Sequence, residues 1–185
     1  LADNEMRNRR IVDDAAKILE AGRSPIILTG RASHVAALSD MLKHHCTNVI
    51  ALVGSASQKE KRETMKRLDE IAKNESMIIV ATGKYVGEGF DCPRLDTLLL
   101  AMPVAWKGTI AQYAGRLHRQ YEGKNEVVIY DYVDVHVPVL EKMYHKRVKG
   151  YAQIGYKAMP ENSALEKTNI IFDENNFQPV FSSDL

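Results

Sequence analysis

The sequence has the composition of a globular protein with a nearly neutral charge. Its 185 residues are 45% hydrophobic and 26% charged, which is enough chain for one domain with a buried core. No apolar run approaches the roughly 20 residues that cross a bilayer, and no signal-type leader opens the chain. Two cysteines are too few for a disulfide framework or a zinc knuckle. We therefore expect a cytoplasmic protein with no membrane partner. At a net charge of +1, a polyanion would have to meet a local basic surface.

The first quarter of the chain alternates helical and extended patterns. Residues 5–21 carry an apolar stripe that includes Ile11 and predict a helix. Residues 25–30 are apolar without alternation, which is typical of a strand buried on both faces. A second helix is predicted over 33–45 and a second buried strand over 48–54.

The same alternation continues to the middle of the chain. Ser57 and Glu60 form an S-x-x-E capping box, which predicts the start of a third helix over 57–74. Apolar strands are predicted over 77–83 and 96–103, joined by a glycine-rich connection. Strands and helices in this order predict a mostly parallel α/β sheet with helices on both faces.

The last third adds a helix over 109–121, a strand over 126–132 and a helix from Pro138 to about residue 150. Residues 169–181 either form a hairpin with its turn at 174–176 or pack elsewhere as a tail. We expect one domain over 1–157 and a polar tail over 158–185. The chain begins with leucine rather than methionine, so we expect it to be a piece of a longer protein.

Three of the predicted loops follow the carboxyl ends of strands, where ligands of parallel sheets gather. They are "TGRAS" (29–33), "GSAS" (54–57) and "TGKYVGEGFD" (82–91). Glycines, hydroxyl groups and helix amino termini suit phosphate oxygens, although glycine and serine also simply make short turns. The third loop lacks the G-x-G-x-x-G spacing, and no G-x-x-x-x-G-K-[ST] motif occurs in the chain.

The stretch "QYAGRLHRQ" (112–120) places Gln112, Arg116 and Arg119 on one face of the predicted helix. No aspartate or glutamate occurs over 97–121, so we expect both arginines to lack an acidic partner and to face the edge where the strands end. Guanidinium groups arranged in this way suit a phosphate. Two simpler interpretations remain: Gln112 caps the helix with Thr109, or the arginines are a solvated face. Gly115 suggests a close backbone approach.

Four segments together resemble superfamily 2 helicases. "QYAGRLHR" is similar to their motif VI, "VATGKYVGEGFDCP" to motif V, "SPIILTGRASHVAALSDML" to motif IV and "VGSASQKEKRETMKRL" to the segment that follows motif IV. The order and spacing match over about residues 5–150, most closely in the bacterial DEAD/DEAH-box and type III restriction (Res-subunit) helicases. Many relatives have glycine where His118 stands.

The resemblance implies the carboxy-terminal RecA-like domain, a three-layer sandwich, of an ATP-dependent helicase. ATP and Mg²⁺ would be held mainly by an amino-terminal RecA-like domain, a partner absent from this chain. Arg119 would be the arginine finger, assisted by Arg116 and Gln112. Asp91 would lie near the ribose or hold a finger arginine. Gly87 and Gly89 would also lie beside the nucleotide, at the edge of the cleft between the two domains. A DNA or RNA backbone would be gripped by Gly30, Arg31, Ser55, Ser57, Thr82, Gly83 and Lys84.

Several other features have a simple and a functional interpretation. The basic run over 142–149 is a solvated face or touches nucleic acid, and Trp106 with Lys107 stacks on a base or anchors the loop. His44–Cys46 lacks a matching ligand pair, and no metal site is expected. The competing functions are a non-catalytic RecA-like binding module and, with less support, a nucleotide-sugar transferase.

Overall fold

Strands and helices follow one another as the hydrophobic pattern predicts. The computed structural model describes residues 2–87, 90–104, 109–134, 137–159 and 167–173. The strands are β1 (Pro25–Thr29), β2 (Asn48–Leu52), β3 (Met77–Thr82), β4 (Thr97–Leu100), β5 (Glu126–Tyr132), β6 (Tyr156–Met159) and β7 (Lys167–Asp173). The helices are α1 (Glu5–Glu20), α2 (Ala32–Leu42), α3 (Gln58–Glu70), α4 (Gly83–Gly87), α5 (Thr109–Leu117) and α6 (Pro138–Gln153). The five predicted strands are β1 to β5, and all five predicted helices are present.

Within the described ranges, seven strands form one sheet in the order β2-β3-β1-β4-β5-β7-β6. The first five strands in this order, β2-β3-β1-β4-β5, run parallel, whereas β7 pairs antiparallel with both β5 and β6. The prediction of a mostly parallel sheet is therefore confirmed. All five parallel strands end at the same edge, which we call the carboxyl edge.

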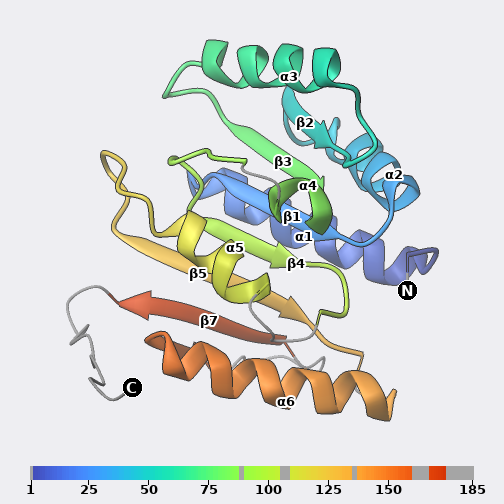
Figure 1. The fold of residues 1–185 in the computed structure, drawn as a ribbon, viewed down its shortest axis with the longest axis vertical. Coiled ribbons are helices and arrows are strands. Elements are labelled where there is room, and N and C mark those ends of the chain that lie inside the picture. Colours follow the sequence, from blue (N-terminus) through green and yellow to red (C-terminus); the bar gives the residue numbers. More distant parts are fainter. Residues whose placement is uncertain (1, 88–89, 105–108, 135–136, 160–166, 174–185) are drawn as a thin grey trace.

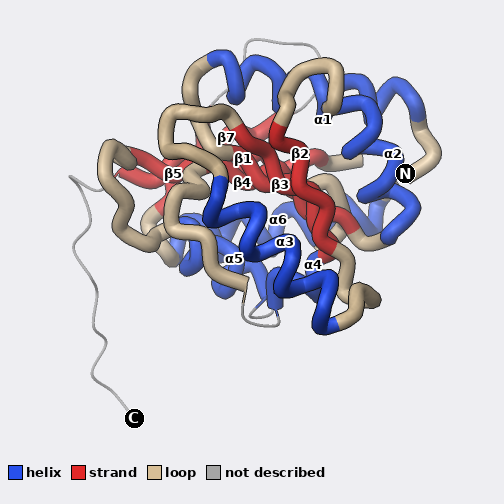
Figure 2. Tube along the Cα trace, turned by 90° about the horizontal axis from the view of Figure 1, so that it is seen from above, coloured by secondary structure: helices blue, strands red, loops and turns tan. Residues whose placement is uncertain are grey.

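Helices cover both faces of the sheet and make three layers. Figure 2 shows α1 and α2 on one face and α3, α4, α5 and α6 on the other. Successive residues of β1 explain why its sequence is apolar throughout: Ile26 and Leu28 pack under α3–α6, while Ile27 packs under α1 and α2. The continuous apolar runs of the sequence are therefore the two-sided core of this sandwich.

Local sequence signals set several helix boundaries. Ser57 and Glu60 form the predicted capping box at the start of α3, with the Ser57 backbone N–H donating to the Glu60 carboxylate at 2.6 Å and the Glu60 N–H donating to Ser57 Oγ at 3.2 Å. Asn4 caps α1 through a bond from the Arg7 backbone N–H at 3.0 Å. No described helix is long and apolar enough to cross a membrane.

Three elements lie where the sequence predicted something else. The connection after β3, expected to be a pliable loop, begins with the short helix α4. β7 joins the sheet beside β5, and its partner β6 precedes it in the chain. The turn predicted at 174–176 falls outside the described residues. β6 spans the expected domain boundary at residue 157, so the sheet continues across it, and the division into two domains stays a prediction.

Candidate functional site

Helix α5, which contains Arg116 and ends two residues before Arg119, runs antiparallel to the parallel strands. The chain leaves β4 at the carboxyl edge, and α5 then returns toward the opposite edge, where β5 begins (Figure 1). This direction is required because a crossover to the next parallel strand must return to the strand's starting edge. Arg116 and Arg119 come at the end of α5, so the expectation that they face the carboxyl edge was wrong. Lys124, which follows them, donates to the carbonyl oxygens of Pro93, just before β4, and of Arg119, at 2.8 and 2.9 Å.

Arg119 has an acidic partner in this chain, contrary to expectation. Its Nη2 atom lies 2.9 Å from Oδ2 of Asp91, and the two side chains are 61% and 40% exposed. Asp91 lies outside the acid-free window of 97–121 that suggested unpaired arginines. The contact agrees with the alternative that Asp91 holds an arginine. The guanidinium nevertheless remains largely open to solvent.

Arg116 lies deeper than Arg119. It is half-buried, and its Nη1 atom donates to the carbonyl oxygen of Phe90. The other face of α5 is buried as predicted, with Ile110 and Ala114 fully buried and Leu117 2% exposed. Gln112 is exposed on the outer face, while the side chain of Thr109, its suggested capping partner, is outside the described set. The segment just after α4 therefore touches both arginines.

Asp91 has a second carboxylate oxygen with unused capacity. Its Oδ1 atom is buried and has no hydrogen-bond partner among the described residues. Buried acceptors in proteins normally have a hydrogen-bond partner, so this oxygen is an exception among the described residues. Gly87, four residues before Asp91 in the sequence, is exposed. Gly89 lies outside the described residues.

Tyr113 joins α5 to the segment after β3. Its hydroxyl donates to the carbonyl oxygen of Gly83 at 2.8 Å, and the ring is 4% exposed. Burial raises the pKa of Tyr113, which keeps the hydroxyl protonated as a donor. Among the described glycines with measured surroundings, Gly83 has the tightest: a Cβ atom there would lie 2.5 Å from the Tyr113 hydroxyl oxygen. This glycine is therefore required for close approach.

The residues expected to grip nucleic acid lie at the carboxyl edge, but only some are accessible. Gly30, Arg31, Ser55, Ser57 and Lys84 are exposed. Thr82 is 8% exposed and accepts a hydrogen bond from the Gly54 backbone N–H at 3.1 Å, and Gly83 is buried under Tyr113. The side chain of Lys84 lies over Gly54, within 3.3 Å of the position that a Cβ atom would take there. The loops after β2 and β3 are thus packed together.

The start of α2 also faces this edge. Arg31 is its N-cap residue, has an extended backbone and makes no side-chain capping bond. Backbone N–H groups in the first turn of a helix carry partial positive charge and suit phosphate oxygens. A cavity of about 330 Å³ adjoins it, lined by Thr29 at the end of β1, His34 on α2 and Met102 after β4, among others.

A buried histidine below this cavity escaped the sequence analysis. His34 Nδ1 lies 2.6 Å from Thr29 Oγ1, and His34 Nε2 lies 2.9 Å from Asn8 Oδ1. Burial lowers the pKa of His34, and the nearby Arg7 guanidinium lowers it further. No single spacing in the sequence predicts this triad, because α1, β1 and α2 each contribute one member.

The basic run over 142–149 divides in the structure. Lys142, His145, Lys146 and Lys149 are exposed. Arg147 is 2% exposed and binds both carboxylate oxygens of Asp131 on β5, at 2.7 and 2.8 Å. Its Nη1 atom also donates to the carbonyl oxygen of Val104 at 2.9 Å. Arg147 is therefore a structural residue that fixes α6 to the sheet.

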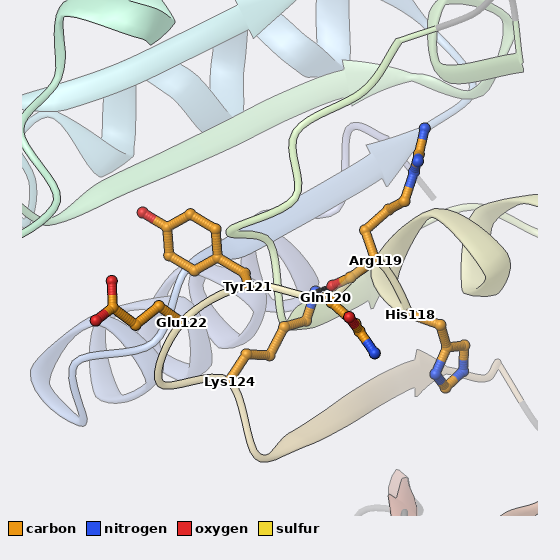
Figure 3. Close-up of a pocket in the computed structure, with 6 residues that line it drawn as sticks. All are labelled: His118, Arg119, Gln120, Tyr121, Glu122 and Lys124. Carbon is orange, nitrogen blue, oxygen red and sulfur yellow. Dashed lines mark hydrogen bonds between the residues drawn. The ribbon is translucent and has the colours of Figure 1, made fainter.

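A second cavity, of about 430 Å³, lies beside Arg119. It is lined by His118, Arg119, Gln120, Tyr121, Glu122 and Lys124. Figure 3 shows Arg119 and His118 extending to opposite sides of this loop. Trp106 and Lys107 lie outside the described residues. No group of three or more potential metal ligands occurs in the described part of the chain.

The fold, with Arg116 and Arg119 at the end of α5, is that of a RecA-like α/β domain of the superfamily 2 helicase type. A family model described as "Helicase conserved C-terminal domain" matches residues 10–121, and the chain belongs to this family.

Similar sequences come from viruses and a phage. Uncharacterized protein 108L of Invertebrate iridescent virus 3 is 36% identical over 92 residues, covering 50% of this chain and 84% of that protein. Transcript termination protein A18 of Fowlpox virus (strain NVSL) is 26% identical over 158 residues, covering 83% of this chain and 33% of A18. ATP-dependent DNA helicase uvsW of Enterobacteria phage T4 is 28% identical over 128 residues, covering 69% and 25%. The chain thus spans a third or less of A18 and uvsW.

Solved structures agree on the fold. The crystal structure of T4 UvsW superposes with a TM-score of 0.65 and 26% identity, covering 82% of this chain and 33% of UvsW. The C-terminal part of the Fun30 ATPase domain, at 16% identity and a TM-score of 0.58, shares the fold. The expected RecA-like class is therefore confirmed.

Proposed function

We propose that this domain is the carboxy-terminal motor half of an ATP-dependent nucleic-acid helicase or translocase, with Arg119 as its arginine finger. The observation that carries the proposal is the permanently charged guanidinium of Arg119, which is 61% exposed just after α5, pairs with Asp91 and lies near half-buried Arg116. The relationship to T4 uvsW, named as an ATP-dependent DNA helicase, supports the same activity.

The residues present fit part of a nucleotide site only. The two guanidinium groups of Arg116 and Arg119 have the charge and the planar donor arrangement that suit phosphate oxygens. The sequence has no phosphate-binding G-x-x-x-x-G-K-[ST] loop. We therefore propose that an amino-terminal domain of the same protein holds the triphosphate and Mg²⁺, and that Arg119 stabilises charge on the transferring phosphoryl group.

The carboxyl edge is the proposed nucleic-acid contact. Arg31 and Lys84 supply exposed positive charge, Ser55 and Ser57 supply hydroxyl groups, and the start of α2 supplies backbone N–H groups. These groups recognise phosphates rather than bases, so binding would depend strongly on salt and weakly on sequence. The two proposed sites lie at opposite ends of α5 and are connected through Tyr113.

The decisive experiment is Arg119→Ala in the full-length protein. An arginine finger contributes roughly 10³–10⁵ in rate, so kcat for ATP should fall by about 10³ or more while the Kd for ATP changes only a few-fold. The matched control is Arg9→Ala, which removes another exposed arginine, 71% exposed and paired with Glu5 on α1. Unchanged turnover in Arg119→Ala would remove Arg119 from the site.

A second measurement separates the motor from a binding module. We expect this chain alone to hydrolyse ATP negligibly and the full-length protein to hydrolyse it in the presence of nucleic acid. Robust Mg²⁺-dependent hydrolysis by the chain alone contradicts the proposed division of labour. A full-length protein that binds nucleic acid but hydrolyses nothing would favour the non-catalytic alternative.

A further inference from the structure

The residue next to Arg119 is attached to a strand outside the family-matched region. His118 Nε2 and the Tyr156 hydroxyl oxygen lie 2.9 Å apart, and their rings meet edge-on with centroids 5.5 Å apart. Tyr156 begins β6, whereas the helicase family match ends at residue 121. The contact therefore joins the arginine-bearing turn to a part of the chain that the family model does not cover.

Tyr156 is itself firmly held. It is 3% exposed, and its ring lies 6.2 Å from that of Tyr151 on α6. The Tyr151 hydroxyl donates to Asp131 at 3.2 Å, and Arg147 binds the same carboxylate. Burial raises the pKa of Tyr156, so its hydroxyl stays protonated. A continuous buried network therefore extends from β5 through α6 and β6 to His118.

Arg119 needs such support because its own contact is weak. An exposed ion pair such as Arg119–Asp91 is screened by solvent and does not by itself fix a long side chain. α5 ends at Leu117, so His118 and Arg119 lie at the last turn, where helices fray. The half-buried His118 side chain is the element of this turn that reaches the buried network.

We propose that Tyr156 is a positioning residue, which holds the 118–119 backbone through His118 and so keeps Arg119 directed at the nucleotide. The proposal rests on the arginine-finger function proposed above. It assigns a role in the ATPase cycle to the α6–β6 segment, which the family match to 10–121 leaves without one.

The test is a double-mutant cycle in the full-length protein with Tyr156→Phe, His118→Phe and the pair. Tyr156→Phe keeps the ring and removes the hydroxyl, and His118→Phe replaces the imidazole with an apolar aromatic ring, so each removes the polar contact. With saturating single-stranded DNA, each single variant should lower kcat about tenfold and leave the KM for ATP within about twofold, because misplacement of a reacting group costs rate. The double variant should be no worse than the singles. His118→Gln, which can still accept from Tyr156, should restore part of the rate.

The control is Tyr132→Phe, which removes another buried tyrosine hydroxyl bond, to Asp14 at 2.8 Å, on the opposite face of the sheet. It should lower the melting temperature as Tyr156→Phe does and leave kcat unchanged. Equal effects of Tyr156→Phe and Tyr132→Phe on kcat would overturn the proposal. If Tyr156→Phe fails to fold, the two His118 variants test the proposal instead. Equal kcat values for His118→Phe and His118→Gln would then overturn the proposal. Loss of turnover in Arg119→Ala with normal turnover in Tyr156→Phe would reject only this inference and retain the proposed function.

Discussion

Tyr113 occupies the space that a side chain at Gly83 would need. Its hydroxyl oxygen would lie 2.5 Å from a Cβ atom at residue 83, and it donates a hydrogen bond to the Gly83 carbonyl oxygen at 2.8 Å. The turn after β3, at the proposed nucleic-acid contact, therefore rests directly on α5, the helix that contains Arg116. A change at one of these segments must be accommodated by the other.

Gly83→Ala should destabilise the domain by about 1–3 kcal/mol, the usual cost of overpacking a core. The Met102 methyl group, 2.6 Å from the added Cβ, can rotate away, but the Tyr113 ring is only 4% exposed and cannot. Gly115→Ala on α5 is the control, because its Cβ would meet nothing within 4 Å. That variant should be stabilised by up to about 1 kcal/mol through helix propensity. Urea unfolding measures both, and equal effects would show that the close approach has no energetic consequence.

Asp91→Asn should lower ATP turnover by less than about fivefold. Asparagine keeps the size of the side chain and removes the charge opposite Arg119, and an exposed ion pair contributes roughly 0.2–1 kcal/mol. Glu5→Gln, which removes the exposed partner of Arg9, serves as the control. The measurement is kcat for ATP in the full-length protein. A loss as large as that of Arg119→Ala would show that Asp91 does more than form an exposed ion pair with Arg119.

The stability of the domain should fall on acidification partly because of His34. Burial and Arg7 lower its pKa in the folded state, so the unfolded chain takes up a proton more readily. The contribution is present above the unfolded value of about 6.5 and is lost as the pH falls below it toward the lowered folded pKa. His34→Gln should therefore show a shallower loss of unfolding free energy between pH 7 and 5. His145→Gln, on the exposed face of α6, is the comparison, and identical slopes for His34→Gln and the unaltered protein would refute the assignment.

Nucleic-acid binding should depend on salt through Arg31 and Lys84. Each phosphate contact that is removed should reduce the slope of log K against log salt concentration by about 0.7 for a single strand. We expect this change for Arg31→Ala and Lys84→Ala in the full-length protein, measured by oligonucleotide binding over a salt series. Lys43→Ala, at the other end of α2 and paired with Asp40 at 3.1 Å, should leave the slope unchanged. Equal slopes for all variants and the unaltered protein would show that the nucleic-acid contact does not lie at the carboxyl edge.

The hydrophobic pattern was a reliable guide to the layers of the fold. Strands buried on both faces are apolar at most positions, and Ile26 and Ile27 show why by packing into opposite layers. The capping box of Ser57 and Glu60 and the buried face of α5 were also predictable, because both depend on residues three or four apart in one helix. β6 was missed. The hairpin alternative for residues 169–181 placed a strand over most of β7, but the pairing of β7 with β5 and β6 was not predicted, because local patterns do not say which segments pair.

The residues of the arginine site were predictable from the sequence, but the prediction of the sheet edge at which they lie was wrong. Sequence spacing put Gln112, Arg116 and Arg119 on one helix face, which is a local property. The partner of Arg119 and the edge of the sheet that Arg119 faces depend on the path of the whole crossover from β4 to β5. That path places Arg119 beside Asp91, which precedes β4 in the chain. Arg147 shows the same limit: it belongs to a basic run in the sequence and to a buried pair with Asp131 in the fold.

The sequence alone determined the approximate positions of β1 to β5 and of the five longer helices, the alternation that produces a parallel sheet, and the motifs that indicate a helicase carboxy-terminal domain. These depend on interactions within a few residues or on the order of segments along the chain. Only the tertiary structure decided that the arginines lie away from the carboxyl edge, that Asp91 pairs with Arg119 and that Tyr156 contacts His118. Those contacts join residues far apart in the chain, and folding alone brings them within hydrogen-bond distance.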